Sequence, residues 1–113
     1  DITYTIGDAL RILPEFAESH GGLSFDLAFI DGNKRQYAEY YDLAVRFLSP
    51  GGYILADNTL WDGHVTDPAY DRDSQTLGIR KFNDLLAADN TVEKVILPIR
   101  DGLTIVRKKT AEG

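Results

Sequence analysis

Acidic and amide side chains follow two apolar segments of the chain, and together they could bind a hard metal ion. The segment FDLAFI (25–30) is followed by Asp31, and YILA (53–56) is followed by Asp57 and Asn58. In an open parallel sheet, ligands bind outside the carboxyl ends of the strands. Two carboxylates at that edge repel each other unless a cation offsets them. Because Mg²⁺ and Ca²⁺ prefer oxygen ligands, the pattern predicts a divalent-cation site.

Each aspartate also has an ordinary structural interpretation. An aspartate after a strand commonly caps the next helix, and Asp31-Gly32 is a common turn dipeptide. The two aspartates together, with Asn58 adjacent to the second, favour the metal site over two separate caps. A zinc site is not expected, because cysteine is absent and His20 and His64 both lie in expected loops.

Two further side chains could take part in chemistry at the same edge. Lys34 lies three residues after Asp31, so its amine can reach the same edge of the sheet. A nearby cation can lower the pKa of a lysine enough for it to act as a base, although most helix lysines are simply solvated. Trp61 lies in a polar stretch, where it could stack on a flat ligand, and the alternative is a core tryptophan.

The elements that must position these residues follow from hydrophobic spacing. Apolar and β-branched runs predict strands at 2–6, 25–30, 53–56, 92–99 and 103–107. Apolar residues at helical spacing predict helices near 10–17, 34–48 and 76–88. Asp8 is placed to cap the first helix, and Pro14 implies that this helix begins late or is kinked.

Turn signals separate these elements, and the order of elements predicts the fold class. Pro50-Gly51-Gly52 predicts a sharp break, residues 59–75 a long loop, and Arg100-Asp101-Gly102 a hairpin turn. Alternating strands and helices predict an α/β fold with a mostly parallel sheet, to which the last hairpin adds an antiparallel edge strand. Residues 1–113 are therefore expected to form a single domain.

Composition excludes several classes of partner. The chain has 113 residues and a net charge of −6, from 18 acids and 12 bases. Nucleic-acid and anionic-membrane surfaces need basic patches, so neither partner is expected. The longest uncharged apolar stretches, about seven residues, are far shorter than a membrane span. The absence of cysteine and of a signal-like opening suits a cytoplasmic protein.

Longer stretches carry a resemblance to a known family. They are GDALRILPEF, FDLAFIDGNKRQYAEYYDLAVRFLSPGGYILADNTLWDGHV, GIRKFNDLLAAD and LPIRDGLTIVRKK, with the motifs D-x-x-K and A-D-N-x-L-W. In this order they resemble the C-terminal part of the cation-dependent O-methyltransferases, the family of caffeoyl-CoA and catechol O-methyltransferases. The resemblance implies a Rossmann-like S-adenosylmethionine-dependent methyltransferase sheet, of which residues 1–113 form a partial domain.

The resemblance also implies an activity and a role for each candidate residue. The family transfers a methyl group from S-adenosylmethionine to a hydroxyl of a catechol-like aromatic ring, with Mg²⁺ or Ca²⁺ bound. The three residues that match its metal ligands are Asp31, Asp57 and Asn58. Lys34 matches the proposed general base. A cation that binds both ring oxygens lowers the pKa of the hydroxyl and directs it at the methyl group.

Cofactor and acceptor positions are matched as well. Asp8 and Ala9 match the turn beside the adenine of S-adenosylmethionine, and Asp31 is assigned to the cofactor as well as to the metal. Trp61 matches an aromatic residue beside the acceptor ring.

One departure from the family pattern is large. The family's first two strands, with a glycine-rich turn and a ribose-binding acid, precede what is Asp1 here, and the chain has no G-x-G-x-x-G motif. The chain is therefore expected to be a fragment, inactive or weak alone. In the family order 3-2-1-4-5-7-6, the segment Ile2–Ile6 then lacks its neighbours, and the flank of 25–30 is exposed. Ile2–Ile6 is expected to fill the vacated position or to pair with another chain in a homodimer.

The sequence also allows two other functions to be compared with this one. A non-enzymatic module that self-associates through the exposed sheet edge is the main alternative. A phosphoryl-transfer enzyme is disfavoured, because no G-x-x-x-x-G-K-[ST] loop accompanies Asp31.

Overall fold

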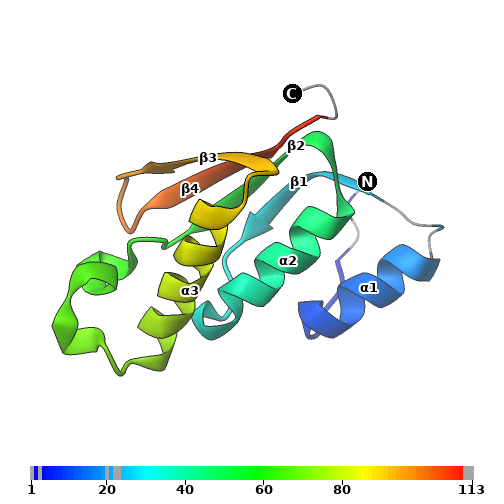
Figure 1. Cartoon of the computed structure of the whole chain (residues 1–113). Helices are drawn as coiled ribbons and strands as arrows, with labels where there is room; N and C mark the ends of the chain where they lie inside the picture. The colour runs from blue at the N-terminus through cyan, green and yellow to red at the C-terminus, as the bar shows by residue number, and fades with distance from the viewer. Residues whose placement is uncertain (1, 3, 20, 22–23, 111–113) are drawn as a thin grey trace.

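A computed structural model describes residues 2, 4–19, 21 and 24–110, which form two layers (Figure 1). One layer is a four-stranded sheet of β1 (Phe25–Ile30), β2 (Leu48–Asp57), β3 (Val92–Leu97) and β4 (Leu103–Lys108). The other contains the helices α1 (Ala9–Ser19), α2 (Tyr37–Phe47) and α3 (Ser74–Ala88). Short 3₁₀ helices are η1 (Lys34–Gln36), η2 (Trp61–Thr66) and η3 (Pro68–Tyr70). All three α-helices lie on the same side of the sheet.

The order of the strands in the sheet is β1-β2-β4-β3. β1 and β2 are parallel, whereas β4 is antiparallel to both of its neighbours, β2 and β3. The α/β fold is therefore confirmed, and the described sheet is mixed, because one pairing is parallel and two are antiparallel. The antiparallel strand is not at the edge, because β4 of the final hairpin lies inside the sheet and β3 forms the edge. This order agrees with the 4-5-7-6 part of the order that the resemblance implies.

The strand predicted at Ile2–Ile6 is wrong for the residues that the structure describes. Residues 2 and 4–6 belong to no strand, and positions 1 and 3 lie outside the described residues. The side chains of Ile2, Tyr4 and Ile6 are 96%, 85% and 81% exposed. A strand is stabilised by hydrogen bonds to a neighbouring strand, and none of the four described strands pairs with this segment. The segment therefore does not fill the position beside β1.

Two local predictions are corrected by the backbone. α1 begins at Ala9 and contains Pro14, so the late start is wrong, while Asp8 does cap the helix by accepting from Leu10 N at 3.0 Å. The break at residues 50–52 falls inside β2, where the pairing with β1 shifts from Leu48 to Tyr53 over two residues of β1. The glycines thus bulge out of the ladder rather than end the strand.

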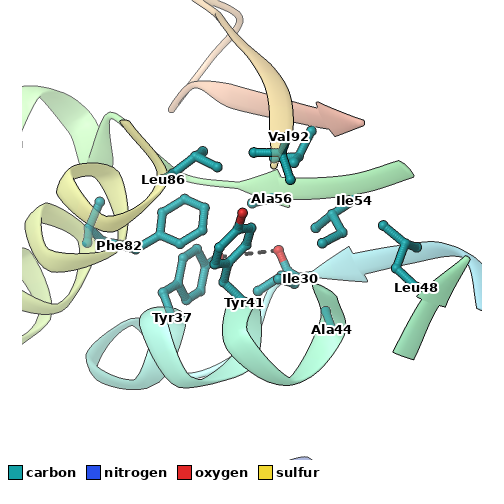
Figure 2. Close-up of a cluster of buried hydrophobic side chains, with 12 residues drawn as sticks. Ile30, Tyr37, Tyr41, Ala44, Leu48, Ile54, Ala56, Phe82, Leu86 and Val92 are labelled. Carbon is teal, nitrogen blue, oxygen red and sulfur yellow. Dashed lines mark hydrogen bonds between the residues drawn. The ribbon is translucent and has the colours of Figure 1, made fainter. Parts of the chain in front are cut away.

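The hydrophobic core lies between the sheet and the helices α2 and α3 (Figure 2). Phe82 of α3 is fully buried, and its ring lies edge-on to those of Tyr37 and Tyr41, with centroids 5.7 Å away in each case. Ile30 and Ala56, the last apolar residues of β1 and β2, belong to the same cluster. The core therefore fixes the start of α2 beneath the carboxyl ends of these two strands.

The opposite face of the sheet is apolar and exposed. Leu27 and Phe29 of β1 are each 59% exposed, and Tyr53 of β2 is 45% exposed. Leu27 pairs with Tyr53 and Phe29 with Leu55, so their side chains project on the same side. No described helix covers this side (Figure 1), which makes it a candidate contact surface.

Candidate active site

The carboxyl ends of β1 and β2 bring Asp31 and Asp57 together. Their preceding residues, Ile30 and Ala56, are directly paired in the parallel ladder. Neighbouring strands lie about 4.8 Å apart, so the two aspartates follow adjacent strand ends at the same edge of the sheet. Asn58 follows with a positive φ of 63°, a conformation that asparagine tolerates better than most residues. The predicted convergence of Asp31, Asp57 and Asn58 at one edge therefore agrees with the strand register.

The hydroxyl of Tyr37 ties these two strand ends to α2. It donates to the Asp57 carbonyl oxygen at 2.7 Å and lies 3.4 Å from the Ile30 carbonyl oxygen. Burial raises the pKa of Tyr37, an effect that the nearby Lys34 ammonium opposes. The sequence shows Tyr37 only as part of an apolar helical stripe, so its role in the site was missed. Its position three residues after Lys34 is the only signal that could have indicated it.

Lys34 lies at the centre of the site. Its Nζ donates to Asp31 Oδ1 at 2.9 Å, to the Tyr37 hydroxyl at 2.9 Å and to the Gly32 carbonyl at 3.1 Å. Only 11% of its side chain is exposed, so the solvated-surface interpretation is wrong. Burial alone would lower the pKa of Lys34, but the hydrogen bonds with Tyr37 and Asp31 outweigh it and raise the pKa. The protein's own groups therefore do not produce the lowered pKa that a base needs.

Asn58 has a second partner from a distant part of the chain. Its Nδ2 donates to Asp101 Oδ2 at 3.1 Å, across 43 residues of sequence. The Asp101 carbonyl accepts from Leu60 N at 2.7 Å and from Trp61 N at 3.3 Å. The sequence identifies Asp101 only as part of a hairpin turn, and that turn is confirmed. Its contact with the site carries no local sequence signal.

Trp61 lies beside Lys34, whose Nζ is 5.9 Å from the centroid of the indole ring. The ring is partly buried against the core, so the core and ligand interpretations of Trp61 both remain compatible with its position.

The predicted loop 59–75 is wrong in part, because it contains η2 and η3. Arg80 of α3 binds this segment through the carbonyls of residues 64, 65 and 67 and the carboxylate of Asp71.

A hollow of about 770 Å³ opens at the carboxyl end of β1. Asp8, Ala9 and Asp31, the three residues assigned to a cofactor, all line it, together with Gly32 and Tyr40. The structure thus brings the start of α1 and the end of β1 to one concave surface.

The donor chemistry at the strand ends suits a hard cation. Within the described residues, no three His, Cys, Asp or Glu side chains gather as a metal site. The oxygen donors at the ends of β1 and β2 are the carboxylates of Asp31 and Asp57 and the amide of Asn58. Oxygen donors of this kind fit Mg²⁺ or Ca²⁺. His64 stacks on Tyr70 with ring centroids 3.6 Å apart, whereas His20 lies outside the described residues.

In the described part of the chain, no helix has the length and apolar character to cross a membrane.

Comparison with known proteins decides the family. A model of the O-methyltransferase family matches residues 1–109. The chain belongs to the O-methyltransferase family. Among its relatives, the probable caffeoyl-CoA O-methyltransferase 1 of Dictyostelium discoideum is 37% identical over 107 residues, which cover 95% of this chain and 46% of that protein.

Solved O-methyltransferase structures share the fold. TomG from Streptomyces achromogenes, which is involved in tomaymycin synthesis and was solved with SAM, superposes with a TM-score of 0.82 at 32% identity. An O-methyltransferase from Bacillus cereus, solved with SAH, gives a TM-score of 0.82 at 31% identity. The match covers 92% and 91% of this chain and 48% of each of those chains. The chain thus spans about half the length of these O-methyltransferases.

Proposed function

We propose that this chain contributes the metal and acceptor part of an S-adenosylmethionine-dependent O-methyltransferase that acts on a catechol-like hydroxyl. The observation that carries the proposal is the convergence of Asp31, Asp57, Asn58 and Lys34 at the carboxyl ends of two paired strands. Family membership and relatives that are caffeoyl-CoA O-methyltransferases support the reaction class.

S-adenosylmethionine is the proposed methyl donor. Two structural relatives were solved with SAM or SAH, and the hollow beside Asp8, Ala9 and Asp31 is concave and lies at the strand ends where α/β folds bind ligands. Asp31 and Asp8 would provide hydrogen-bond acceptors at its rim. Tyr40 and the apolar part of the lining would contact the flat part of the cofactor.

A divalent cation is the second proposed cofactor, held by Asp31, Asp57 and Asn58. When bound it would supply Lewis acidity to the acceptor hydroxyl and lower the pKa of that group. Lys34, when its amine is neutral, would accept the proton from the hydroxyl. An added positive charge beside Asp31 lowers the pKa of Lys34, opposing the hydrogen bonds that now raise it. Trp61 would contact the acceptor ring, since it lies within reach of Lys34.

The cation site predicts a clear binding result for Asp57→Asn. We expect the wild-type chain to bind Ca²⁺, Mg²⁺ and Tb³⁺, and Trp61, the only tryptophan, to sensitise Tb³⁺ luminescence. Asp57→Asn removes a charged ligand and should weaken the affinity by about tenfold or more. Asp26 is an exposed acid near the opposite end of β1, so Asp26→Asn should leave the cation affinity unchanged.

Calorimetry with S-adenosylmethionine completes this test. We expect heat of binding from S-adenosylmethionine, and a catechol-like acceptor should bind only with the cation present. Equal cation affinities for wild-type protein and Asp57→Asn would refute the metal site. Absence of any S-adenosylmethionine binding would instead support the second candidate below.

The second candidate is a homodimeric, non-enzymatic module, which the exposed side of the sheet favours. β1 is an edge strand, and its Leu27 and Phe29 are each 59% exposed beside Tyr53. An exposed apolar edge strand readily pairs with another chain, and a second copy carries the same self-complementary edge.

A charged residue at Phe29 should prevent this self-association. We expect sedimentation of the wild-type chain to depend on concentration, and Phe29→Glu to sediment as a monomer. Leu77→Glu is the control, because Leu77 is 45% exposed but lies on α3, on the helical side of the sheet. A wild-type chain that remains monomeric at all concentrations would contradict the homodimer.

A further inference from the structure

The hydrogen bond between Asn58 and Asp101 decides which atom of the Asn58 amide faces Asp101. An asparagine side chain carries an oxygen acceptor on one side and an NH₂ donor on the other. A carboxylate can only accept, so the amide atom facing Asp101 Oδ2, 3.1 Å away, must be Nδ2. The amide oxygen Oδ1 is then turned away from Asp101.

This orientation matters because hard cations bind amide oxygen and not amide nitrogen. An unrestrained amide can rotate and present either atom, and only one of the two orientations provides a ligand. Partners that orient a ligand in this way commonly change metal affinity by about tenfold to a hundredfold.

The backbone of the same turn holds the rest of the segment. The carbonyl oxygens of Asp101 and Gly102 accept from Leu60 N at 2.7 Å and Thr59 N at 3.3 Å. A Cβ on Gly102 would lie 2.6 Å from Leu60 Cγ, which shows how closely the turn approaches this segment. These contacts use main-chain atoms, so they persist when only the Asp101 side chain is changed.

We propose that Asp101 is a positioning residue that holds the Asn58 amide with its oxygen toward a divalent cation, an inference that rests on the proposed metal site. Asp101 does not itself bind the cation. Its carboxylate acts through Asn58, and the hairpin between β3 and β4 thereby belongs to the functional site.

Two substitutions at Asp101 test the inference. Asp101→Ala removes the acceptor and should weaken Tb³⁺ and Ca²⁺ affinity by about tenfold or more. Asp101→Asn removes the charge but keeps an amide oxygen that can accept from Asn58 Nδ2, so its affinity should stay within about threefold of wild type. The side-chain NH₂ signals of Asn58 in a ¹⁵N–¹H spectrum, recorded without cation, should shift in Asp101→Ala. Thermal unfolding of both variants checks that they are folded.

The outcomes separate this inference from the function on which it rests. If wild type binds the cation and Asp57→Asn does not, but Asp101→Ala binds as wild type does, the positioning role is overturned and the metal site stands. If Asp101→Asn loses as much affinity as Asp101→Ala, the Asp101 charge acts directly on the cation and the positioning role is again overturned. If wild type binds no cation at all, the metal site and the positioning role both fail.

Discussion

Phe82→Ala is expected to lower the free energy of unfolding by about 3–5 kcal/mol, because it opens a cavity in the centre of the core. Phe82 is fully buried, and its ring contacts both Tyr37 and Tyr41 edge-to-face. A loss of this size is a large fraction of the total stability of an ordinary domain. Urea unfolding followed by circular dichroism measures it. Leu85→Ala on the same helix is the control, since Leu85 is 37% exposed and should cost far less.

The same substitution should reach the functional site. Tyr37 holds the carboxyl ends of β1 and β2 through its hydroxyl, and Phe82 is the ring that fixes Tyr37 from the side of α3. We therefore expect Phe82→Ala to weaken cation binding under conditions where the variant is still folded. Equal losses of stability in Phe82→Ala and Leu85→Ala would contradict the central role of Phe82.

Gly78→Ala is expected to destabilise the protein, although helix propensity alone predicts the opposite. Replacing glycine by alanine inside an exposed helix normally stabilises it by about 1 kcal/mol. A Cβ at position 78 would lie 2.3 Å from the Lys34 carbonyl oxygen and 2.6 Å from Arg35 Cα, both backbone atoms of η1. Such overpacking typically costs about 1–3 kcal/mol, so we expect a net loss of stability.

The backbone of η1 can relieve this contact only by moving, and Lys34 moves with it. We expect the backbone amide signals of Lys34 and Arg35 in a ¹⁵N–¹H spectrum to shift in Gly78→Ala. Lys34 is then displaced within the candidate active site. Gln75→Ala, on an exposed position of the same helix, is the control for propensity. An increase in unfolding free energy for Gly78→Ala would show that α3 and η1 are not in tight contact.

Much of the framework was readable from the local pattern of residues. The strand β1 occupies the predicted residues 25–30, and α3 begins two residues before its predicted start. These elements are readable because a continuous apolar run marks a strand, and helical spacing of apolar residues marks one buried face. The run does not show how much of the strand is covered, since Leu27 and Phe29 of β1 are each 59% exposed. The positions of Asp31, Asp57 and Asn58 follow at once, since each lies directly beyond such a run.

The sequence by itself therefore determined the type of most elements and which polar residues lie at the strand ends. Only the tertiary structure decided that Ile2–Ile6 forms no strand in the described residues, that Lys34 is buried against Tyr37, and that Asp101 reaches Asn58. The physical reason is that the hydrophobic periodicity of one segment indicates only which of its side chains face the core and which face solvent. Strand pairing, the depth of a side chain and a contact across 43 residues depend instead on which distant segments the packing places beside each other.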